Sequence, residues 1–314
     1  MVTLPSAEQF GLCDRTILIT GGAGFIGRHL VASLAPANDV HVLDDCSTGD
    51  PTTLHPAASL RQGDVRNPES YTEFGADLDL IVHLAGLVSV DRSIEVPRET
   101  EQANAAGTLE VLEAARRSDA SVVTASSAAV YGEPSAVPVT ESQPKTPSSP
   151  YGAEKLSGDR YMRLYADLYD LDTVALRYFN VYGPGGIGTD YSGVIDAFLT
   201  RARRNEELPV HGDGTQTRDF VHVSDVVQAN LLAAVTEQTG DAYNVGTGKS
   251  VTINRLAELI VDVTDSSSDI VHTEPRAGDI DESEANIERA RDQLGYEPRT
   301  TLRDGLEALV HDAT

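Results

Sequence analysis

Residues 16–27, TILITGGAGFIG, decide the fold of this chain. Five mostly apolar residues with strong strand propensity run directly into Gly21, Gly24 and Gly27, and a helix-like apolar segment follows. Glycine permits a tight turn and lets the backbone approach a pyrophosphate, which then lies at the N-terminus of the helix. The G-x-x-G-x-x-G spacing in this context predicts a dinucleotide-binding loop. The simpler alternative is three turn glycines without a ligand.

The alternation of strand and helix continues through the first half of the chain. Mostly apolar runs at 16–20, 40–43, 80–84, 121–125 and 173–177 indicate strands, and 97–117 and 151–170 indicate helices. Continuous apolar strands are typical of a parallel sheet that is covered on both faces. The pattern predicts an α/β fold with a doubly wound parallel sheet.

The regular alternation ends after Arg177. Five prolines in the stretch 133–150 exclude a helix there, and a glycine- and proline-rich loop begins at Gly183. We therefore expect a second, smaller C-terminal α/β lobe that contributes the substrate contacts. The expected parts are a nucleotide-binding domain at 1–177, to which 220–250 returns, and a substrate lobe at 178–219 and 251–314.

The composition excludes several classes of function. The chain has 314 residues and a formal net charge of −25, so it repels phosphate backbones and anionic bilayers; we expect no nucleic-acid or membrane partner. The longest apolar run, 80–90, is too short to span a bilayer, and acids stand where a signal peptide carries basic residues. Only Cys13 and Cys46 are present, which predicts no disulfide framework, no metal cluster and a cytoplasmic location.

Lysine is unusually scarce. The chain contains only Lys145, Lys155 and Lys249, so arginine supplies nearly all the positive charge. Few lysines and many acids are typical of proteins from salt-rich cytoplasms, because concentrated salt screens self-repulsion. We expect a halophilic protein; an ordinary acidic cytosolic enzyme is the alternative.

Asp44 indicates which dinucleotide is bound. It ends the second expected strand, about 20 residues after the glycine turn, where an acid accepts hydrogen bonds from the adenosine ribose hydroxyls. A 2′-phosphate would face Asp44 and Asp45 with no arginine nearby in the sequence. This predicts NAD rather than NADP, with a solvated strand-end acid as the alternative.

The candidate catalytic group is Tyr151-Gly-Ala-Glu-Lys155. On a helix, residues i and i+4 share one face, so the phenol and the ammonium can address one site. A phenol near pKa 10 becomes a base at pH 7 with roughly 4 kcal/mol of phenolate stabilisation, which a nearby ammonium and a nicotinamide cation can supply. At the end of the 121–125 strand, Ser127 can relay the proton to Tyr151, and Ser126 can contact substrate. A surface tyrosine–lysine pair and satisfied turn hydroxyls are the alternatives.

Further motifs give the chain a clear resemblance. They are GGAGFIG, GDV at Asp64, HLAG at 83–86, NAAGT at Asn104, SSAAVYG, YGAEK, RYFNVYGP at 177–184 and GDGTQTRDFVHVSDV at 212–226. In order and over essentially the whole chain, they resemble the extended short-chain dehydrogenase/reductase superfamily. The resemblance is to the NAD-dependent nucleotide-sugar epimerase/dehydratase family, and most closely to UDP-glucose 4-epimerases. It implies a Rossmann-type fold, NAD as cofactor and a UDP-sugar as substrate.

The resemblance also implies roles for individual residues. Tyr151 is implied as the catalytic base, Lys155 as its partner that also holds the nicotinamide ribose, and Ser127 as the active-site hydroxyl. The implied cofactor contacts are Gly21, Gly24, Phe25, Ile26, Gly27, Asp44, Asp64, Val65, Leu84, Ala85, Asn104, Lys155 and Tyr178. The implied substrate contacts are Ser126, Ser127, Tyr151, Asn180, the pyrophosphate clamps Arg218 and Arg276, and Asp279 at the uridine ribose. For Arg218, an ion pair with Asp213, Asp219 or Asp225 is the alternative.

Two departures from the family pattern concern substrate and cofactor contacts. Val88 stands where some 4-epimerases have a lysine, and Gly193 where some members have an amide that holds the diphosphate. The residues after Ser127 are Ala128 and Ala129, whereas dehydratases carry an acid there for the leaving hydroxyl. This favours epimerisation of a UDP-hexose at C4 through a transient 4-keto sugar.

The identity of the sugar and the exact reaction stay open at this level. Ser283 falls where epimerases restricted to hexoses tend to have a bulkier residue, so the N-acetyl sugars are further candidates. The alternatives are a UDP-glucuronate 4-epimerase or decarboxylase, a dehydratase, a sugar-nucleotide reductase and a non-catalytic NAD sensor.

A helical stripe predicts self-association. Apolar and aromatic residues recur at helical spacing at Tyr161, Leu164, Tyr165, Leu168 and Tyr169. Part of the stripe is expected to pack on the protein's own sheet. Together with 97–117, it resembles the family's dimer face, which implies a homodimer held by a four-helix bundle.

Overall fold

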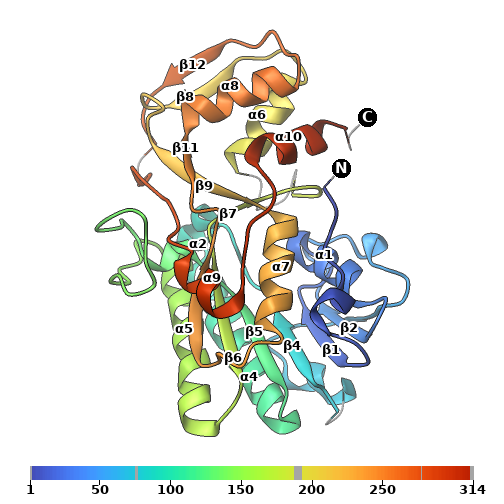
Figure 1. The fold of residues 1–314 in the computed structure, drawn as a ribbon. Coiled ribbons are helices and arrows are strands. Elements are labelled where there is room, and N and C mark those ends of the chain that lie inside the picture. The colour runs from blue at the N-terminus through green and yellow to red at the C-terminus, as the bar shows by residue number, and fades with distance from the viewer. Residues whose placement is uncertain (1, 75–76, 187–192, 277, 312–314) are drawn as a thin grey trace.

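The computed structural model describes residues 2–74, 77–186, 193–276 and 278–311. Within them, a seven-stranded parallel sheet forms the centre of the larger lobe, in the order β10-β6-β5-β4-β1-β2-β3 (Figure 1). Its strands are β1 (Thr16–Thr20), β2 (Asp39–Asp44), β3 (Ser59–Gln62), β4 (Leu80–His83), β5 (Ser121–Ser127), β6 (Thr173–Tyr178) and β10 (Asp241–Val245). The predicted doubly wound, Rossmann-type sheet is confirmed.

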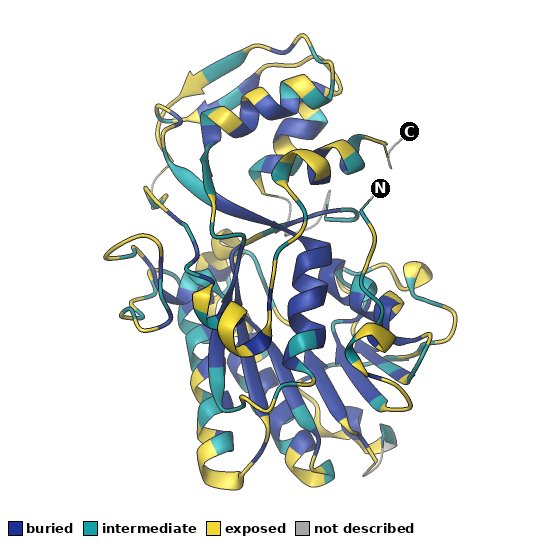
Figure 2. Ribbon diagram, viewed as in Figure 1, coloured by how far each residue is buried: buried dark blue, intermediate teal, exposed yellow. Residues whose placement is uncertain are grey.

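Helices cover both faces of this sheet because successive residues of each strand point to opposite sides. Ile17 and Ile19 of β1 belong to the core under α1 (Phe25–Leu34) and α7 (Val223–Ala233). Leu18 between them belongs to the core under α4 (Gly107–Ser118) and α5 (Pro150–Tyr169). This is why the central strands read as unbroken apolar runs: both faces of these strands are buried (Figure 2).

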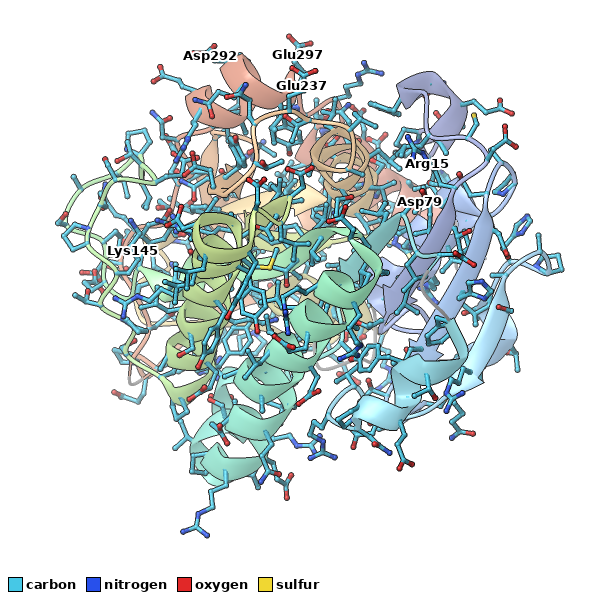
Figure 3. The ribbon with its side chains drawn as sticks, turned by 90° about the horizontal axis from the view of Figure 1, so that it is seen from below. Arg15, Asp79, Lys145, Glu237, Asp292 and Glu297 are labelled. Atoms are coloured by element: carbon cyan, nitrogen blue, oxygen red, sulfur yellow. The ribbon has the colours of Figure 1, made fainter. Side chains whose placement is uncertain are left out.

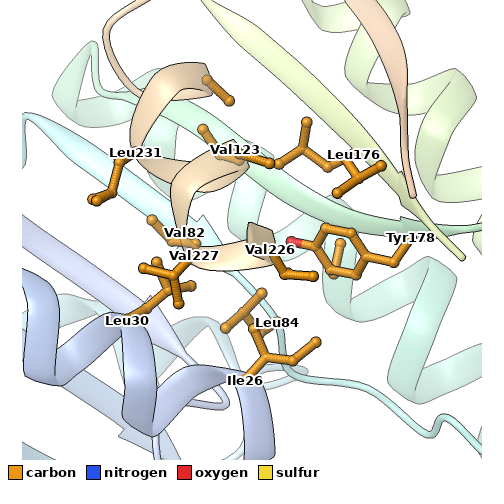
Figure 4. Close-up of a cluster of buried hydrophobic side chains, with 14 of the residues drawn as sticks. Ile26, Leu30, Val82, Leu84, Val123, Leu176, Tyr178, Val226, Val227 and Leu231 are labelled. Carbon is orange, nitrogen blue, oxygen red and sulfur yellow. The ribbon is translucent and has the colours of Figure 1, made fainter. Parts of the chain in front are cut away.

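Helix α7 returns the chain to the larger lobe after an excursion into the smaller one. Its Val226, Val227 and Leu231 pack against α1 and against side chains of the central strands (Figure 4). β10 then pairs with β6 at the edge of the sheet. The stretch 285–296, including α9 (Glu288–Leu294), also packs into this core through Ala290 and Tyr296. The remaining helical elements of the larger lobe are η1 (Ala7–Phe10), η2 (Pro51–Thr53), η3 (Pro68–Phe74), α2 (Val90–Glu95), α3 (Pro97–Glu101), the π-helical turn η4 (Gln102–Ala106) and η5 (Ala128–Val130).

The smaller lobe lies at the carboxyl end of the parallel strands (Figure 1). Its elements are β7 (Asn180–Tyr182), α6 (Val194–Ala202), β8 (Leu208–His211), β9 (Thr217–His222), β11 (Ser250–Thr252), α8 (Ile253–Val263), β12 (Ile270–Thr273) and α10 (Leu302–His311). The strands form a three-stranded sheet, β11-β9-β7, and a two-stranded sheet, β12-β8. A separate core, centred on Phe198, Leu256 and Leu306, holds the lobe together. The cleft between the two lobes therefore opens where parallel α/β sheets bind ligands.

No helix among the described residues is long and apolar enough to cross a membrane. Within the same residues, no group of three or more His, Cys, Asp or Glu side chains is placed to hold a metal ion.

Candidate active site

The turn between β1 and α1 is packed so closely against neighbouring backbone that two of its glycines have no room for a side chain. Gly21 adopts a left-handed φ of 70° and donates its N–H to the carbonyl of Leu43 at 2.9 Å. A Cβ atom on Gly21 would lie 2.6 Å from the backbone nitrogen of Ala85, and one on Gly27 would lie 2.2 Å from the carbonyl oxygen of Gly21. Only glycine fits these positions. The bare backbone at the start of α1 forms the cradle that a dinucleotide pyrophosphate needs.

A cavity of about 570 Å³ extends from this turn over the ends of β1, β2, β3 and β4. Ten of the predicted cofactor-binding residues line it: Gly21, Gly24, Phe25, Ile26, Gly27, Asp44, Asp64, Val65, Leu84 and Ala85. Residues from four separate strand ends thus meet at one groove. Its size and lining fit an extended dinucleotide.

Asp44 is buried at the end of β2 and fixes two backbone segments. One carboxylate oxygen accepts the N–H of Ala23 at 2.9 Å, and the other accepts the N–H of Cys46 at 2.8 Å. The carboxylate therefore shapes the glycine turn from within the groove. A carboxylate oxygen has more than one lone pair, so these contacts leave Asp44 able to accept from a ribose hydroxyl.

Arg66 is a cofactor-groove residue that sequence reasoning missed. No arginine is near Asp44 along the chain, but Arg66 lines the same cavity. It donates to both carboxylate oxygens of Asp64, and this hydrogen bonding raises the pKa of Arg66, with Asp45 adding to the effect. The feature of the sequence that could have indicated Arg66 is its position two residues after Asp64, directly after the GDV motif. Because Asp64 already engages it, this guanidinium is not a ready site for a 2′-phosphate.

A second cavity, of about 530 Å³, joins the first, since Phe25 and Val88 line both. The predicted residues on its wall are Ser126, Ser127, Tyr151, Lys155, Tyr178, Asn180 and Arg276. The structure thus gathers the catalytic candidates beside the cofactor groove. Gly193, at the start of α6, also lines this cavity.

The start of α5 determines where Tyr151 lies. Ser149 caps the helix by accepting the N–H of Gly152 at 3.1 Å, and Pro150 occupies the first helical position. The N–H of Tyr151 donates to the hydroxyl of Ser93 on α2 at 3.2 Å. The backbone of Tyr151 is therefore fixed by two neighbouring elements.

Tyr151 and Ser127 line the same cavity, and their side chains interact there. Burial raises the pKa of Tyr151, and the Ser127 contact opposes that rise. The Ser127 hydroxyl also accepts the N–H of Ala129 at 3.1 Å. This arrangement places Ser127 to pass a proton to or from Tyr151.

Lys155 lies one helical turn after Tyr151 and is almost fully buried. Its Nζ donates to the carbonyl of Ala125 at 2.9 Å, and burial lowers the pKa of Lys155 to about 8. Nearby, His83 is held between the hydroxyls of Thr20 and Thr108. Burial and the charge of Lys155 lower the pKa of His83 to about 3, so it is neutral. Of these two neighbouring side chains, Lys155 is therefore the one that carries a positive charge beside Tyr151.

Asn104 and Tyr178 are held by internal hydrogen bonds. The Asn104 side chain accepts from the N–H of Leu87 at 2.8 Å and donates to its carbonyl at 2.9 Å. It shapes the loop after β4 from the π-helical turn η4 and is absent from the described lining of both cavities. Tyr178 lines the catalytic cavity, while its hydroxyl bonds to the buried amide of Asn230. Asn104 is thus placed to position a cofactor-groove loop.

The two predicted clamps form ion pairs at the outer side of the cleft. Arg276 pairs with Asp91 of α2, across the two lobes, and Arg218 pairs with Asp279. None of the three acids considered from the sequence is the partner of Arg218 in these pairs. A third cavity, of about 770 Å³, is lined by Arg276 and Asp279 and adjoins the catalytic cavity at Arg276. The cleft thus continues outward past Arg276, whereas Arg218 is absent from the described lining of both cavities.

Asp91 and Asp196 are further cleft residues that sequence reasoning did not single out. Both line the catalytic cavity. Asp91 lies in the segment after HLAG, a few residues beyond the Val88 departure, and Asp196 follows Gly193; their positions beside those departures were the available signal.

Comparisons with known proteins identify the family. The NAD-dependent epimerase/dehydratase family matches residues 17–246. UDP-glucose 4-epimerase of Mycolicibacterium smegmatis is 35% identical over 310 residues, covering 93% of this chain and 96% of that protein. The structure of UDP-glucose 4-epimerase from Thermotoga maritima with UDP-glucose has a TM-score of 0.90 at 35% identity, covering 94% of this chain and 97% of that one. UDP-N-acetylglucosamine 4-epimerase from Methanobrevibacter ruminantium, in complex with UDP-N-acetylmuramic acid, also has a TM-score of 0.90 at 35% identity, covering 96% and 99%.

The match extends over both lobes, and the glycine cradle lies where a dinucleotide would bind. The chain therefore belongs to the NAD-dependent epimerase/dehydratase family of the extended short-chain dehydrogenases/reductases, and NAD is its cofactor.

Proposed function

We propose that the chain is an isomerase that interconverts UDP-glucose and UDP-galactose at C4. The observation that carries the proposal is the buried Tyr151–Ser127 contact beside the cofactor groove, followed by Ala128 and Ala129. A dehydratase needs a further proton-transfer group for the leaving hydroxyl. Two alanines cannot supply it, whereas epimerisation needs only Tyr151, Ser127 and the cofactor.

The proposed chemistry assigns one task to each residue. Bound NAD supplies the hydride acceptor and donor. Tyr151, as phenolate, removes the C4 hydroxyl proton through Ser127 as the C4–H bond breaks, which leaves a 4-keto sugar. Lys155 stabilises the phenolate by its charge. After the sugar has turned about its link to the diphosphate, Tyr151 returns the proton as a new C4–H bond forms on the opposite face.

Firm binding of the diphosphate and loose binding of the sugar follow from where the charges lie. Arg276 lines both the catalytic and the outer cavity, and Arg218 with Asp279 lies beyond it. Guanidinium groups pair with phosphates in two-point contacts. We assign these arginines to the diphosphate, Asp279 to the uridine ribose, and Asn180 and Ser126 to the sugar side.

Proton NMR of UDP-galactose incubated with the enzyme and NAD tests the proposal. We expect UDP-glucose to appear, and deuterium placed at C4 to stay on the sugar. Loss of that deuterium to water, or net formation of free NADH, would contradict epimerisation and indicate another family reaction. The same assay with UDP-N-acetylglucosamine and UDP-glucuronate identifies which sugar nucleotides the enzyme converts. The sequence position that raised the N-acetyl sugars as candidates is Ser283. It is buried, and its N–H donates to the hydroxyl of Thr217 at 3.4 Å.

We also infer a homodimer, formed by α4, α5 and the same helices of a second copy. Leu164, Leu168 and Tyr169 of the predicted stripe are exposed, whereas Tyr165 is buried and donates to Glu113 on α4 at 2.6 Å.

The acidic composition and the two free cysteines support a salt-adapted, cytoplasmic enzyme. For the domain division, the packing of 285–296 against α7 and β10 supports grouping that stretch with the nucleotide-binding domain.

A further inference from the structure

Three consecutive residues at the end of β5 each interact with a different residue of α5, the first two through hydrogen bonds. The three pairs are Ala125 O with Lys155 Nζ at 2.9 Å, Ser126 Oγ with Asp159 Oδ2 at 3.3 Å, and Ser127 with the hydroxyl of Tyr151. The helix residues are spaced four apart, so they lie on one face of α5. Two of the three pairs belong to the proposed catalytic group, and the Asp159 pair has no role in the mechanism above.

Asp159 is only 1% exposed and accepts four hydrogen bonds. Besides Ser126, it accepts from Nε and Nη2 of Arg177 at 2.8 and 3.1 Å, and from Nη2 of Arg163 at 3.0 Å. Arg177, on β6, is fully buried. A carboxylate with this set of donors is held in one orientation, because each oxygen has its own partners.

Hydrogen bonds connect the Asp159–Arg177 pair to two further strands, β5 through Ser126 and β10 through Tyr131. Arg177 donates to the hydroxyl of Tyr131 at 2.9 Å, and that hydroxyl donates to the amide oxygen of Asn244 on β10 at 2.7 Å. The network therefore connects α5 with β5, β6 and β10. Asp159 and Arg177 are absent from the described lining of the catalytic cavity, so they act on it only through their neighbours.

We propose that Asp159 is a positioning residue for catalysis: it fixes the register of α5 against the end of β5, and thereby the contact between Tyr151 and Ser127. Proton transfer requires the two hydroxyls to stay at hydrogen-bond distance, and a displacement of about 1 Å can lower a rate about 100-fold. The inference rests on the proposed function for its kinetic consequence. Its structural consequence, the local fixing of β5 on α5, is independent of which reaction is catalysed.

The test compares Asp159→Asn and Ser126→Ala with a matched control, Asp225→Asn. An amide at 159 keeps only one acceptor oxygen, so Arg177 loses one of its two bonds, and either Ser126, which shares Oδ2 with it, or Arg163, which shares Oδ1, loses its acceptor as well. Ser126→Ala removes the contact between β5 and Asp159, together with the hydroxyl assigned to the sugar side; hydrogen exchange in the enzyme without substrate reports the first effect alone. Asp225 is equally buried and accepts the backbone N–H groups of Arg299 and Thr300, away from the cavity. It therefore reports the effect of losing a buried carboxylate as such.

We expect Asp159→Asn to lower kcat for UDP-galactose about 10- to 100-fold per folded subunit, with KM within about twofold of wild type. Ser126→Ala is expected to lower kcat about three- to tenfold with an unchanged melting temperature. Asp225→Asn should lower the melting temperature and leave kcat per folded subunit unchanged. Amide hydrogen exchange should rise at 125–130 and 150–156 in the first two variants only.

A kcat per folded subunit near wild type in Asp159→Asn, without faster exchange at 125–130, would overturn the proposal. If that variant does not fold, Ser126→Ala decides through hydrogen exchange in the enzyme without substrate: wild-type exchange at 125–130 and 150–156 overturns the proposal, and faster exchange there together with reduced kcat supports it. If the wild-type enzyme does not convert UDP-galactose, the proposed function fails. The exchange measurement alone then tests whether Asp159 fixes β5 on α5.

Discussion

Tyr151 lies in surroundings that oppose the charge it must carry. Burial raises its pKa, and the hydrogen bond to Ser127 offsets this only in part. The Lys155 ammonium, one helical turn away, donates to the carbonyl of Ala125 at 2.9 Å. Bringing the phenol from pKa 10 to about 7 takes roughly 4 kcal/mol. The positive charge of the bound nicotinamide, together with Lys155, is therefore needed before Tyr151 becomes a base.

Replacing Tyr151 with Phe tests its role as the proton-transfer group. Positioned acid–base groups contribute about 10²–10⁴-fold to a rate, so we expect turnover to fall by that factor. NAD binding, measured by fluorescence titration, should stay within about twofold of wild type because the cofactor cradle is made by other residues. A Phe variant with near-native turnover would refute the assignment.

Lys155 gives the enzyme an alkaline limit. Burial lowers its pKa to about 8, so it is an ammonium below that pH and loses its charge as the pH rises through it. Because the neutral amine no longer stabilises the phenolate, kcat/KM should decline above about pH 8. Lys155→Arg, whose charge persists, should remove this decline although its rate is lower. A profile that is flat to pH 9.5 in the wild type would contradict the prediction.

At the scale of elements, the turn between β1 and α1 has the least tolerance for change. A Cβ on Gly27 would overlap the carbonyl of Gly21, 2.2 Å away, whereas one on Gly24 would lie 3.2 Å from that oxygen. Overpacking of this kind costs about 1–3 kcal/mol, so Gly27→Ala should weaken NAD binding about 5- to 150-fold. Gly24→Ala should weaken it less. Equal effects in a titration of both variants would show that the close approach is not limiting.

The exposed part of α5 predicts the oligomeric state. Leu168 is 68% exposed, and Leu164 lies one turn before it on the same face. We expect the wild type to be a dimer in light scattering at high salt, and Leu164→Glu/Leu168→Glu to be a monomer, since charge is disfavoured in a dimer core. Leu60→Glu, an exposed leucine on edge strand β3, is the control and should remain a dimer. A monomeric wild type would end the proposal.

Elements with strong local signals could be predicted, and others could not. β1 runs from Thr16 to Thr20 as expected, and α5 differs by one residue at each end. β3 was missed because its four residues, SLRQ, are polar and mostly exposed at the sheet edge. The expected helix at 97–117 contains the π-helical turn η4, which Asn104 uses to reach Leu87. Hydrophobic periodicity carries no information on that insertion.

For the whole molecule, charge is the dominant feature. Figure 3 shows acids such as Glu237, Asp292 and Glu297 at the periphery, while Arg15 pairs with Asp79 at 3.3 Å at the end of the sheet opposite the cleft. With a net charge of −25, self-repulsion falls as the Debye length shortens from about 10 Å at 0.1 M salt to about 3 Å at 1 M. We expect the melting temperature and activity to rise with KCl. The same rise with an uncharged osmolyte would show that screening is not the cause.

Those parts of the candidate site that lie in motifs directly after strands could be predicted from the sequence. Parallel strands end at one edge, so motifs far apart in sequence meet there, and ten predicted cofactor residues line one groove. Ion pairs between distant segments could not be predicted. Arg276 and Asp91 lie on different lobes, and Arg218 has Asp279 as its partner, none of the three acids expected. Such pairs depend on how the lobes meet, which no local pattern encodes.

The bridge between Arg276 and Asp91 has a consequence for how the enzyme would be loaded and emptied. Both side chains are more than half exposed, so water screens their attraction and the pair separates at little cost. If Arg276 binds the diphosphate, an arriving nucleotide sugar replaces Asp91 as the counter-ion of Arg276. Asp91 pairs with Arg276 again when the product leaves. The nucleotide sugar then has a short residence time at Arg276. This suits an enzyme whose substrate and product differ only in the direction of a single hydroxyl.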